Sequence, residues 1–184
     1  MPRLIFCLLI SFASMSAIMA QGNDSSGCAS QLCIRVNDAL FSHINQSNDK
    51  DSTVNSNAGY TLSFYKQLSK NFYLGGGSGI EMSRYYFEQI KKHDKVLQMP
   101  LYMSLRIATD NQFVSLIEEA GILVPVQSNY AIGTGAYLLT GFQVGYKSLR
   151  MELSYKILSA PQTQGKTLFI NNLNIGLFLT LLSN

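Results

Sequence analysis

The sequence predicts an all-β protein, an eight-stranded antiparallel up-and-down transmembrane β-barrel that follows a cleaved signal peptide. Three observations support this fold class. One segment alternates between apolar and other residues over a dozen positions, and similar two-faced segments recur along the chain. Short turns also alternate with long polar connections from one end of the chain to the other. A meander of strands that crosses a membrane has all of these features.

The clearest alternation lies in residues 96–108. Apolar side chains occupy every second position, at Leu97, Met99, Leu101, Met103, Leu105 and Ile107, with Gln98, Pro100, Tyr102, Ser104 and Arg106 between them. A period of two marks a strand with one apolar face and one polar face. Globular strands usually have about five or six residues, whereas a tilted strand needs about 10 to cross a bilayer. We therefore expect Leu97 to Ile107 to face lipid.

Residues 1–20 have the features of a secretory signal peptide. Arg3 provides the positive charge, residues 4–10 form a short apolar core, and small residues lead to Ala20. The core is too short for a membrane-anchoring helix. We expect cleavage after Ala20, a periplasmic segment over residues 21–32, and a barrel domain over residues 33–184.

The strands and their connections follow in order. Strands are expected over residues 33–44, 58–68, 72–87, 95–108, 113–126, 134–146, 149–158 and 168–182. Short turns at 69–71, 109–112 and 147–148 alternate with longer polar connections at 45–57, 88–94, 127–133 and 159–167. This order places every short turn, and both ends of the barrel, on one side of a membrane. In a bacterial outer membrane that side is the periplasm.

Alternation also assigns the faces of the other strands. We expect outward positions at Phe72, Leu74, Ile80, Met82, Ala136, Leu138, Phe142, Val144, Leu149, Met151, Leu153, Tyr155, Ile157, Leu173, Ile175, Leu177, Leu179 and Leu181. Aromatic residues near the strand ends (Phe72, Phe113 and Tyr146; Tyr60, Tyr85, Tyr86 and Phe87) predict two interfacial girdles. Two places fit less well. Glu118 falls on the lipid-facing side of its strand, where a β-bulge at Glu118–Glu119 would relieve it, and the first strand alternates weakly.

The same register places charged residues inside the barrel, at Glu81, Arg106, Glu119, Arg150, Glu152 and Lys156. An eight-stranded barrel is just wide enough for its own side chains to fill it. Charges that pair there would form a polar plug, and we expect Arg106 to meet Glu81 or Glu119. A proton or ion path through the same network is the alternative, and the structural plug is favoured.

Three stretches carry a resemblance to a known family: GYTLSFYKQLSKNFYLGGGSGIEMSRYYF (59–87), VLQMPLYMSLRI (96–107) and GFQVGYKSLRMELSYKI (141–157). They resemble the outer-membrane β-barrel proteins of Bacteroidetes-type bacteria, the PorT-like group. The resemblance covers about two-thirds of the chain, from Gly59 to Leu182. It implies the barrel fold and an outer-membrane location. It implies no chemistry, because most members of this family have no known function.

Few residues suggest a reactive site. Cys28 and Cys33 remain after signal cleavage, and an exported chain permits a disulfide between them. His43 and His93 lack the spacing of metal ligands, and the adjacent pair His93–Asp94 lacks the geometry of a catalytic triad. We therefore expect no metal, no cofactor and no enzymatic activity.

Charge restricts the partners. Removing Arg3 leaves 13 basic residues against 11 acidic ones, which is too balanced to suggest a nucleic-acid partner. Lys91, Lys92 and Lys95 form a basic cluster in a long connection, where a solvated loop tip is favoured over contact with lipopolysaccharide phosphates. We expect a monomer that meets outer-membrane lipid, lipopolysaccharide included, and other envelope proteins.

The sequence thus predicts a non-enzymatic outer-membrane barrel with a plugged polar lumen. Its role is structural or adhesive, or that of an assembly partner, and the outer loops carry it. A narrow channel for small solutes and a secreted lipocalin-like binding barrel are the alternatives. The inward positions disfavour a lipophilic pocket, because they are rich in glycine, amide and charged side chains.

Overall fold

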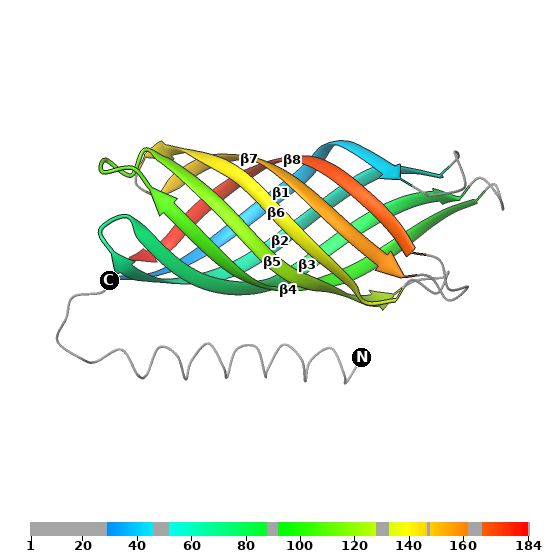
Figure 1. The fold of residues 1–184 in the computed structure, drawn as a ribbon, viewed down its shortest axis with the longest axis horizontal. Helices are drawn as coiled ribbons and strands as arrows, with labels where there is room; N and C mark the ends of the chain where they lie inside the picture. Colours follow the sequence, from blue (N-terminus) through cyan, green and yellow to red (C-terminus); the bar gives the residue numbers. More distant parts are fainter. Residues whose placement is uncertain are drawn as a thin grey trace.

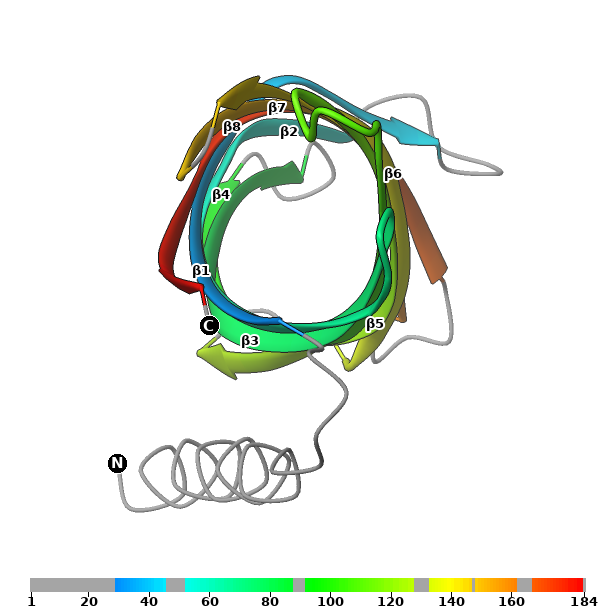
Figure 2. The same cartoon turned by 90° about the vertical axis from the view of Figure 1, so that its left-hand side faces the viewer.

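The computed structural model describes residues 29–45, 52–87, 92–127, 133–146, 148–161 and 167–183. Its strands are β1 (Ser30–Asn45), β2 (Ser52–Ser69), β3 (Phe72–Phe87), β4 (Lys92–Ala108), β5 (Val114–Gln127), β6 (Gly135–Tyr146), β7 (Leu149–Pro161) and β8 (Thr167–Ser183). Each pairs antiparallel with the next, and β1 pairs with β8 to close the barrel (Figures 1 and 2). The predicted eight-stranded antiparallel up-and-down barrel is confirmed. The predicted signal peptide and residues 21–28 lie outside the described residues, which include no helix long and apolar enough to cross a membrane.

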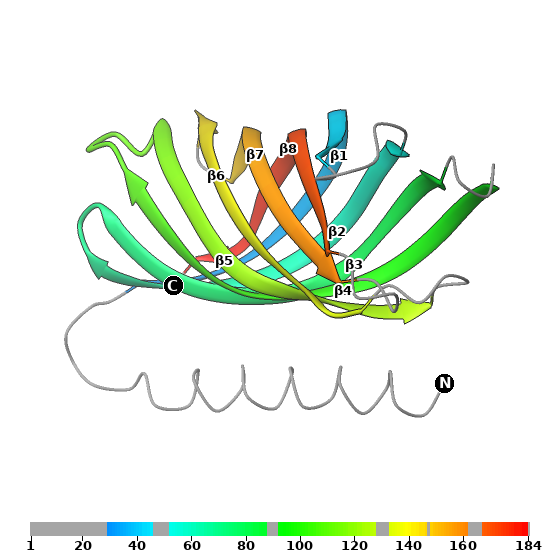
Figure 3. The same cartoon turned by 45° about the vertical axis from the view of Figure 1, so that its right-hand side comes forward.

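The strands match the predicted order, and several are longer than expected. Ser30–Leu32 belong to β1 instead of a separate segment, and residues 52–57 belong to β2 instead of a loop. Those polar residues extend the ladder because β3 continues to Phe87 and offers its backbone to Ser52. Backbone pairing of this kind does not depend on an apolar side chain. At the long-connection end, β3 and β4 reach farthest along the barrel axis (Figures 1 and 3).

The predicted faces agree with the structure in the strands that alternate most strongly. Along β6, exposed and buried residues alternate from Gly135 to Val144. In β7 and β8 the outward positions from Leu149 to Ile157 and from Leu173 to Leu181 are exposed, as predicted. On β4, Met99 departs from the expectation, because only 6% of it is exposed although it lies on the outward face with Val124 directly opposite.

Glu118 keeps its place on the outward face of β5. No bulge relieves it, because the pairing of β5 with β4 and with β6 runs through Glu118 and Glu119 without a shift. The carboxylate is satisfied across the strands instead. Thr140, directly opposite on β6, donates a hydrogen bond from Oγ1 to Glu118 Oε1 at 2.6 Å.

Glycines line the inner side of β3 because neighbouring backbone approaches closely there. A Cβ atom at Gly79 would lie 2.0 Å from the carbonyl oxygen of Tyr60 and 2.7 Å from Thr61 Cα, both on β2. A side chain at this position must push the two strands apart. Glycine in a strand often marks this kind of close approach.

Gly79→Ala is therefore expected to destabilise the barrel by about 1–3 kcal/mol, the usual range for overpacking. Gly176→Ala is the matched control. It also lies on the inner face, but beyond one oxygen at 2.9 Å its nearest neighbour is at 3.6 Å. Urea unfolding followed by circular dichroism measures both variants. If Gly176→Ala lowered the free energy of unfolding as much as Gly79→Ala, the close approach of the backbone would not explain the glycine at position 79.

Two short turns are joined by a contact that depends on pH. Asn71 Nδ2 donates to Asp110 Oδ1 at 3.0 Å, and Lys70 Nζ lies 3.2 Å from the same oxygen. The hydrogen bond from Asn71 and then the contact with Lys70 hold the pKa of Asp110 below its usual range. The stabilisation is therefore complete above the pKa of the unfolded carboxyl group and is lost as pH falls through the lowered pKa.

Asn71→Ala should raise the pKa of Asp110 toward its ordinary value, because the variant lacks the main hydrogen-bond donor. An NMR titration of the Asp110 side-chain carboxyl carbon measures this pKa in the wild type and in the variant. An unchanged pKa in the variant would show that the hydrogen bond across the turns does not form.

Candidate functional site: the barrel lumen

The inward-facing side chains form a lower, a middle and an upper layer between the short-turn end and the long-connection end. Arg106 and Arg150 lie in the lower layer, each within two residues of a strand end. Arg35 lies in the middle layer with Glu119 and Glu152, and Lys156 lies above them with Glu81. All of these side chains are buried. The structure therefore places all six predicted interior charges inside the barrel.

The middle layer is a three-residue ion cluster that crosses the lumen from β1 to β5 and β7. Arg35 Nη1 and Nη2 bind the two carboxylate oxygens of Glu119 at 2.7 and 2.9 Å. Nη1 also lies 3.3 Å from Glu152 Oε1. This two-pronged arginine–carboxylate geometry is the strongest form of the interaction. The cluster ties strands together that are not neighbours in the sheet.

Neutral side chains complete the cluster. Arg35 Nε donates to Thr61 Oγ1 at 3.2 Å, and Gln143 Nε2 donates to Glu152 Oε2 at 3.0 Å. The guanidinium also lies 5.5 Å from the centroid of the Tyr102 ring. Every group of the ion cluster thus has a polar or aromatic partner, which is the condition under which buried charges are tolerated.

A separate ion pair lies in the upper layer. Lys156 Nζ is 2.6 Å from Glu81 Oε2 and 4.4 Å from the centroid of the Tyr137 ring. Glu81 on β3 is thereby joined across the lumen to Lys156 on β7. This ion pair and the ion cluster occupy the lumen at different heights.

Arg106 does not meet Glu81 or Glu119, so that prediction is wrong. Glu119 is bound by Arg35 and Glu81 by Lys156. Arg106 instead lies among aromatic rings, with the centroids of Tyr73, Tyr65 and Phe178 at 4.2, 5.0 and 5.8 Å from its Cζ atom. Its Nη2 donates to Gln31 Oε1 at 2.5 Å. Cation–π contacts replace the expected carboxylate.

Arg150 also lies in the lower layer, and its Nη1 atom is 3.5 Å from Thr180 Oγ1. Neither it nor Arg106 has a carboxylate partner among the described residues. Cys33 lies nearby, fully buried, with Sγ 3.7 Å from Thr180 Oγ1. Cys28 lies outside the described residues, so the disulfide remains a prediction.

Arg35 is the central residue of the lumen, and it was not among the predicted interior charges. The signal was present, because Leu32, Ile34 and Val36 alternate with Arg35 and Asn37. A register shift between Ala39 and Phe41, where β1 pairs with β8, interrupts this alternation. The whole strand consequently appears irregular in sequence although its first half is regular.

An apolar cluster lies among these charged side chains, since Ile117 is the direct cross-strand partner of Arg106, and Leu139 is a direct partner of both Glu119 and Lys156. Its members are buried and come from β4 to β8: Val96, Tyr102, Ile117, Leu123, Tyr137, Leu139, Leu158 and Ile170. The lumen is therefore filled by two kinds of side chain, the ion pairs that cross it and the apolar residues packed between them.

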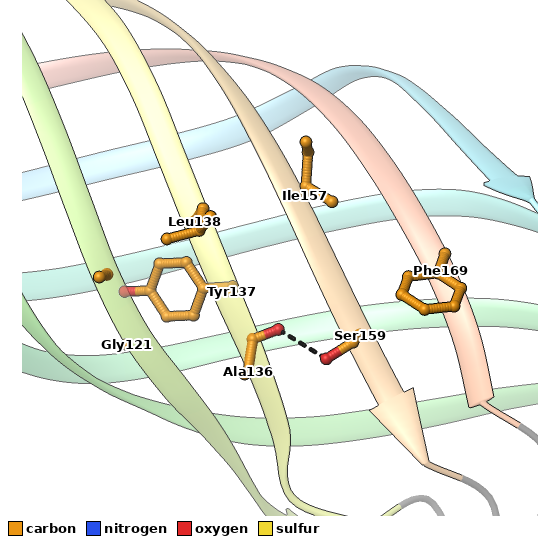
Figure 4. Close-up of a pocket in the computed structure, with 8 residues that line it drawn as sticks. Gly121, Ala136, Tyr137, Leu138, Ile157, Ser159 and Phe169 are labelled. Carbon is orange, nitrogen blue, oxygen red and sulfur yellow. Dashed lines mark hydrogen bonds between the residues drawn. The ribbon is translucent and has the colours of Figure 1, made fainter.

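An open depression of about 340 Å³ lies on the outward face of the barrel, over β5 to β8 (Figure 4). It is lined by Ala120, Gly121, Ala136, Tyr137, Leu138, Ile157, Ser159 and Phe169. The Ser159 hydroxyl already donates to the carbonyl of Ala136 at 3.2 Å, and the Tyr137 ring points toward Gly121. The lining contains no carboxylate, histidine or cysteine.

Within the described part of the chain, no three His, Cys, Asp or Glu side chains come together as a possible set of metal ligands. The side chains of His43 and His93, and that of Lys92, lie outside it, as does Lys91. The lumen carboxylates described here are all bound to cations, so the arrangement is suited to bracing the barrel and to blocking its lumen.

Comparison with known proteins supports the fold. The crystal structure of Neisserial surface protein A (NspA) matches with a TM-score of 0.50 and 12% sequence identity, over 85% of this chain and 98% of that one. The chain shares a barrel fold with NspA. Ail, the attachment invasion locus protein of Yersinia pestis, matches with a TM-score of 0.44 and 13% identity, over 84% of this chain and 100% of that one.

The outer membrane protein OprG from Pseudomonas aeruginosa matches with a TM-score of 0.40 and 11% identity, over 86% of this chain and 98% of that one. Neither a protein-family model nor a curated protein matches the sequence. At 12% identity the similarity to NspA concerns the fold and not the activity.

Proposed function

We propose that the chain is a non-enzymatic outer-membrane β-barrel with a plugged polar lumen, and that it acts through its outer loops. One observation carries the proposal. The barrel is inside out compared with a soluble protein, because Arg35, Glu119, Glu152, Lys156 and Glu81 form ion pairs in the lumen while a band of large apolar side chains faces outward.

The outward face is broadly apolar. Exposed large apolar residues occur on all eight strands, among them Leu40, Tyr60, Leu74, Met103, Ile122, Leu138, Leu153 and Leu177. Soluble monomers rarely expose a contiguous apolar patch of more than a few hundred Å². A band of this kind around a closed barrel is expected where the solvent is lipid. The aromatic residues Phe72, Phe113 and Tyr146, exposed near the short turns, fit an interfacial girdle.

The contents of the lumen argue against the two alternatives. A lipocalin-like barrel needs an apolar pocket inside, and the middle of this lumen holds Arg35, Glu119 and Glu152. A small-solute channel needs an open path, and an eight-stranded barrel whose side chains meet across the axis leaves none. We therefore propose a barrel that does not conduct.

Without a conducting lumen, the chain can engage partners through its surfaces outside the membrane. At the long-connection end, the ends of β3 and β4 extend beyond the other strands and offer such a surface (Figure 1). We propose a structural, adhesive or assembly role there, with lipopolysaccharide and other envelope proteins as partners and the chain itself a monomer. The resemblance to the PorT-like group supports the same location.

Cell fractionation followed by gel electrophoresis tests the proposed location. The protein should be recovered in the outer-membrane fraction and should migrate differently in unboiled and boiled samples, because a closed barrel resists detergent until it is heated. Recovery as a soluble periplasmic protein without heat-dependent migration would contradict the proposal.

A further inference from the structure

Two basic side chains face each other on the outer surface of the β3–β4 hairpin. Arg84 on β3 lies directly opposite Lys95 on β4, and both are exposed on the outward face. Among the described residues, no other two cations are direct cross-strand partners. We call these two residues the basic pair.

The basic pair is unfavourable by itself. Like charges directly opposite each other on neighbouring strands destabilise a sheet, because their side chains are held close together. Among the described side chains, neither Arg84 nor Lys95 has a carboxylate within ion-pair distance. An anion placed between the two side chains would remove the repulsion.

The position of the basic pair identifies the kind of anion. The next outward residues along the two strands are Met82 and Leu97, which are direct partners and belong to the apolar outer face. At Leu97, β4 meets the last residue of β5, Gln127, so the basic pair lies on the part of the hairpin that extends beyond β5. It therefore lies at the upper boundary of the apolar face, where lipid headgroups meet water.

We propose that Arg84 and Lys95 bind the phosphate group of a lipid in the outer leaflet, with the acyl chains lying against the apolar face below Met82 and Leu97. This inference rests on the outer-membrane location proposed above. The strands fix both cations in one geometry, which a loop cluster would not do. Arginine gives directed hydrogen bonds to phosphate oxygens, and lysine adds a point charge.

The binding test uses full-length protein folded in a neutral detergent and titrated with diphosphorylated lipid A, with bound lipid counted by native mass spectrometry. Arg84→Gln combined with Lys95→Gln should weaken binding about thirtyfold, the effect of two surface cations at about 1 kcal/mol each. The control combines Lys66→Gln with Lys70→Gln, which removes the same charge near the short-turn end. It should leave binding within about twofold.

Lys95→Glu separates binding from a purely structural role. The variant places a carboxylate opposite Arg84, so the fold should gain thermal stability in neutral detergent while lipid A binding falls. If Lys95 only supported the strand, the variant would lose thermal stability and lipid A binding together. Loss of stability with unchanged lipid binding would overturn the proposal.

The remaining outcomes distinguish the site from the proposed location. If the protein folds as a heat-modifiable barrel and both double variants bind lipid A alike, the site is wrong and the location stands. If the wild type never folds into detergent or lipid as a barrel, the location itself is wrong. Inorganic phosphate at the same concentration should not compete, and equal competition would reassign the site to free phosphate.

Discussion

Arg35→Met is expected to lower the free energy of unfolding by about 3–5 kcal/mol, the usual cost of removing one partner from a buried ion pair. The substitution removes the guanidinium group and puts an unbranched apolar side chain of similar length in its place. Glu119 and Glu152 would then face each other as buried carboxylates without their cation. Two like charges in a low-dielectric interior repel strongly, and both lose their principal hydrogen bonds.

The carboxylates, and not the lost volume, should account for most of this effect. Adding Glu119→Gln and Glu152→Gln to Arg35→Met removes both negative charges and should recover a large part of the stability. Lys70→Met, in an ion pair whose side chains are 74% and 75% exposed, is the surface control and should change little. Circular dichroism in urea suits the measurement, because the chain contains no Trp for fluorescence. If Arg35→Met lowered the free energy of unfolding no more than Lys70→Met, the ion cluster would not stabilise the barrel.

Leu153→Arg should destabilise the barrel in lipid vesicles by about 2–4 kcal/mol, the cost of a cation near the middle of a bilayer. Leu153 lies halfway along the outward positions of β7 and is 50% exposed, with Phe142 and Ile175 as its cross-strand partners. No carboxylate lies directly opposite to offset the new charge.

Leu149→Arg is the matched control, since Leu149 lies on the same face of β7 and is 54% exposed. It begins the strand at the short-turn end, where the cost should fall to about 0–1 kcal/mol. Unfolding in vesicles measures both variants. A soluble barrel would tolerate both substitutions equally, so equal effects would show that the outer face does not lie in lipid.

Local patterns were sufficient to predict most of this fold. The alternation in 96–108 and in 149–158, with short turns between strands, predicted the order, direction and faces of β4 and β7. Each of these features depends on residues near each other in the chain. The polar first residues of β2 were not predicted to be part of the strand, because their pairing is not local. Ser52 pairs with Phe87, so the start of β2 depends on how far β3 extends.

The partners inside the lumen could not be predicted in the same way. The pairing of cations with carboxylates in the lumen depends on how β1 pairs with β8, and the whole barrel sets that register. Arg35 reaches Glu119 from β1 only because the barrel closes, and it thereby takes the partner expected for Arg106. Arg106 lies instead beside Tyr65, Tyr73 and Phe178, three rings whose convergence no local pattern showed.

Planar-bilayer conductance tests most directly whether the lumen of this membrane barrel is plugged. Wild-type protein that folds into lipid should give no steady conductance, because Arg35, Glu119 and Glu152 close the middle of the lumen and Lys156 pairs with Glu81 above them. A steady open conductance of the folded protein would contradict the plugged lumen.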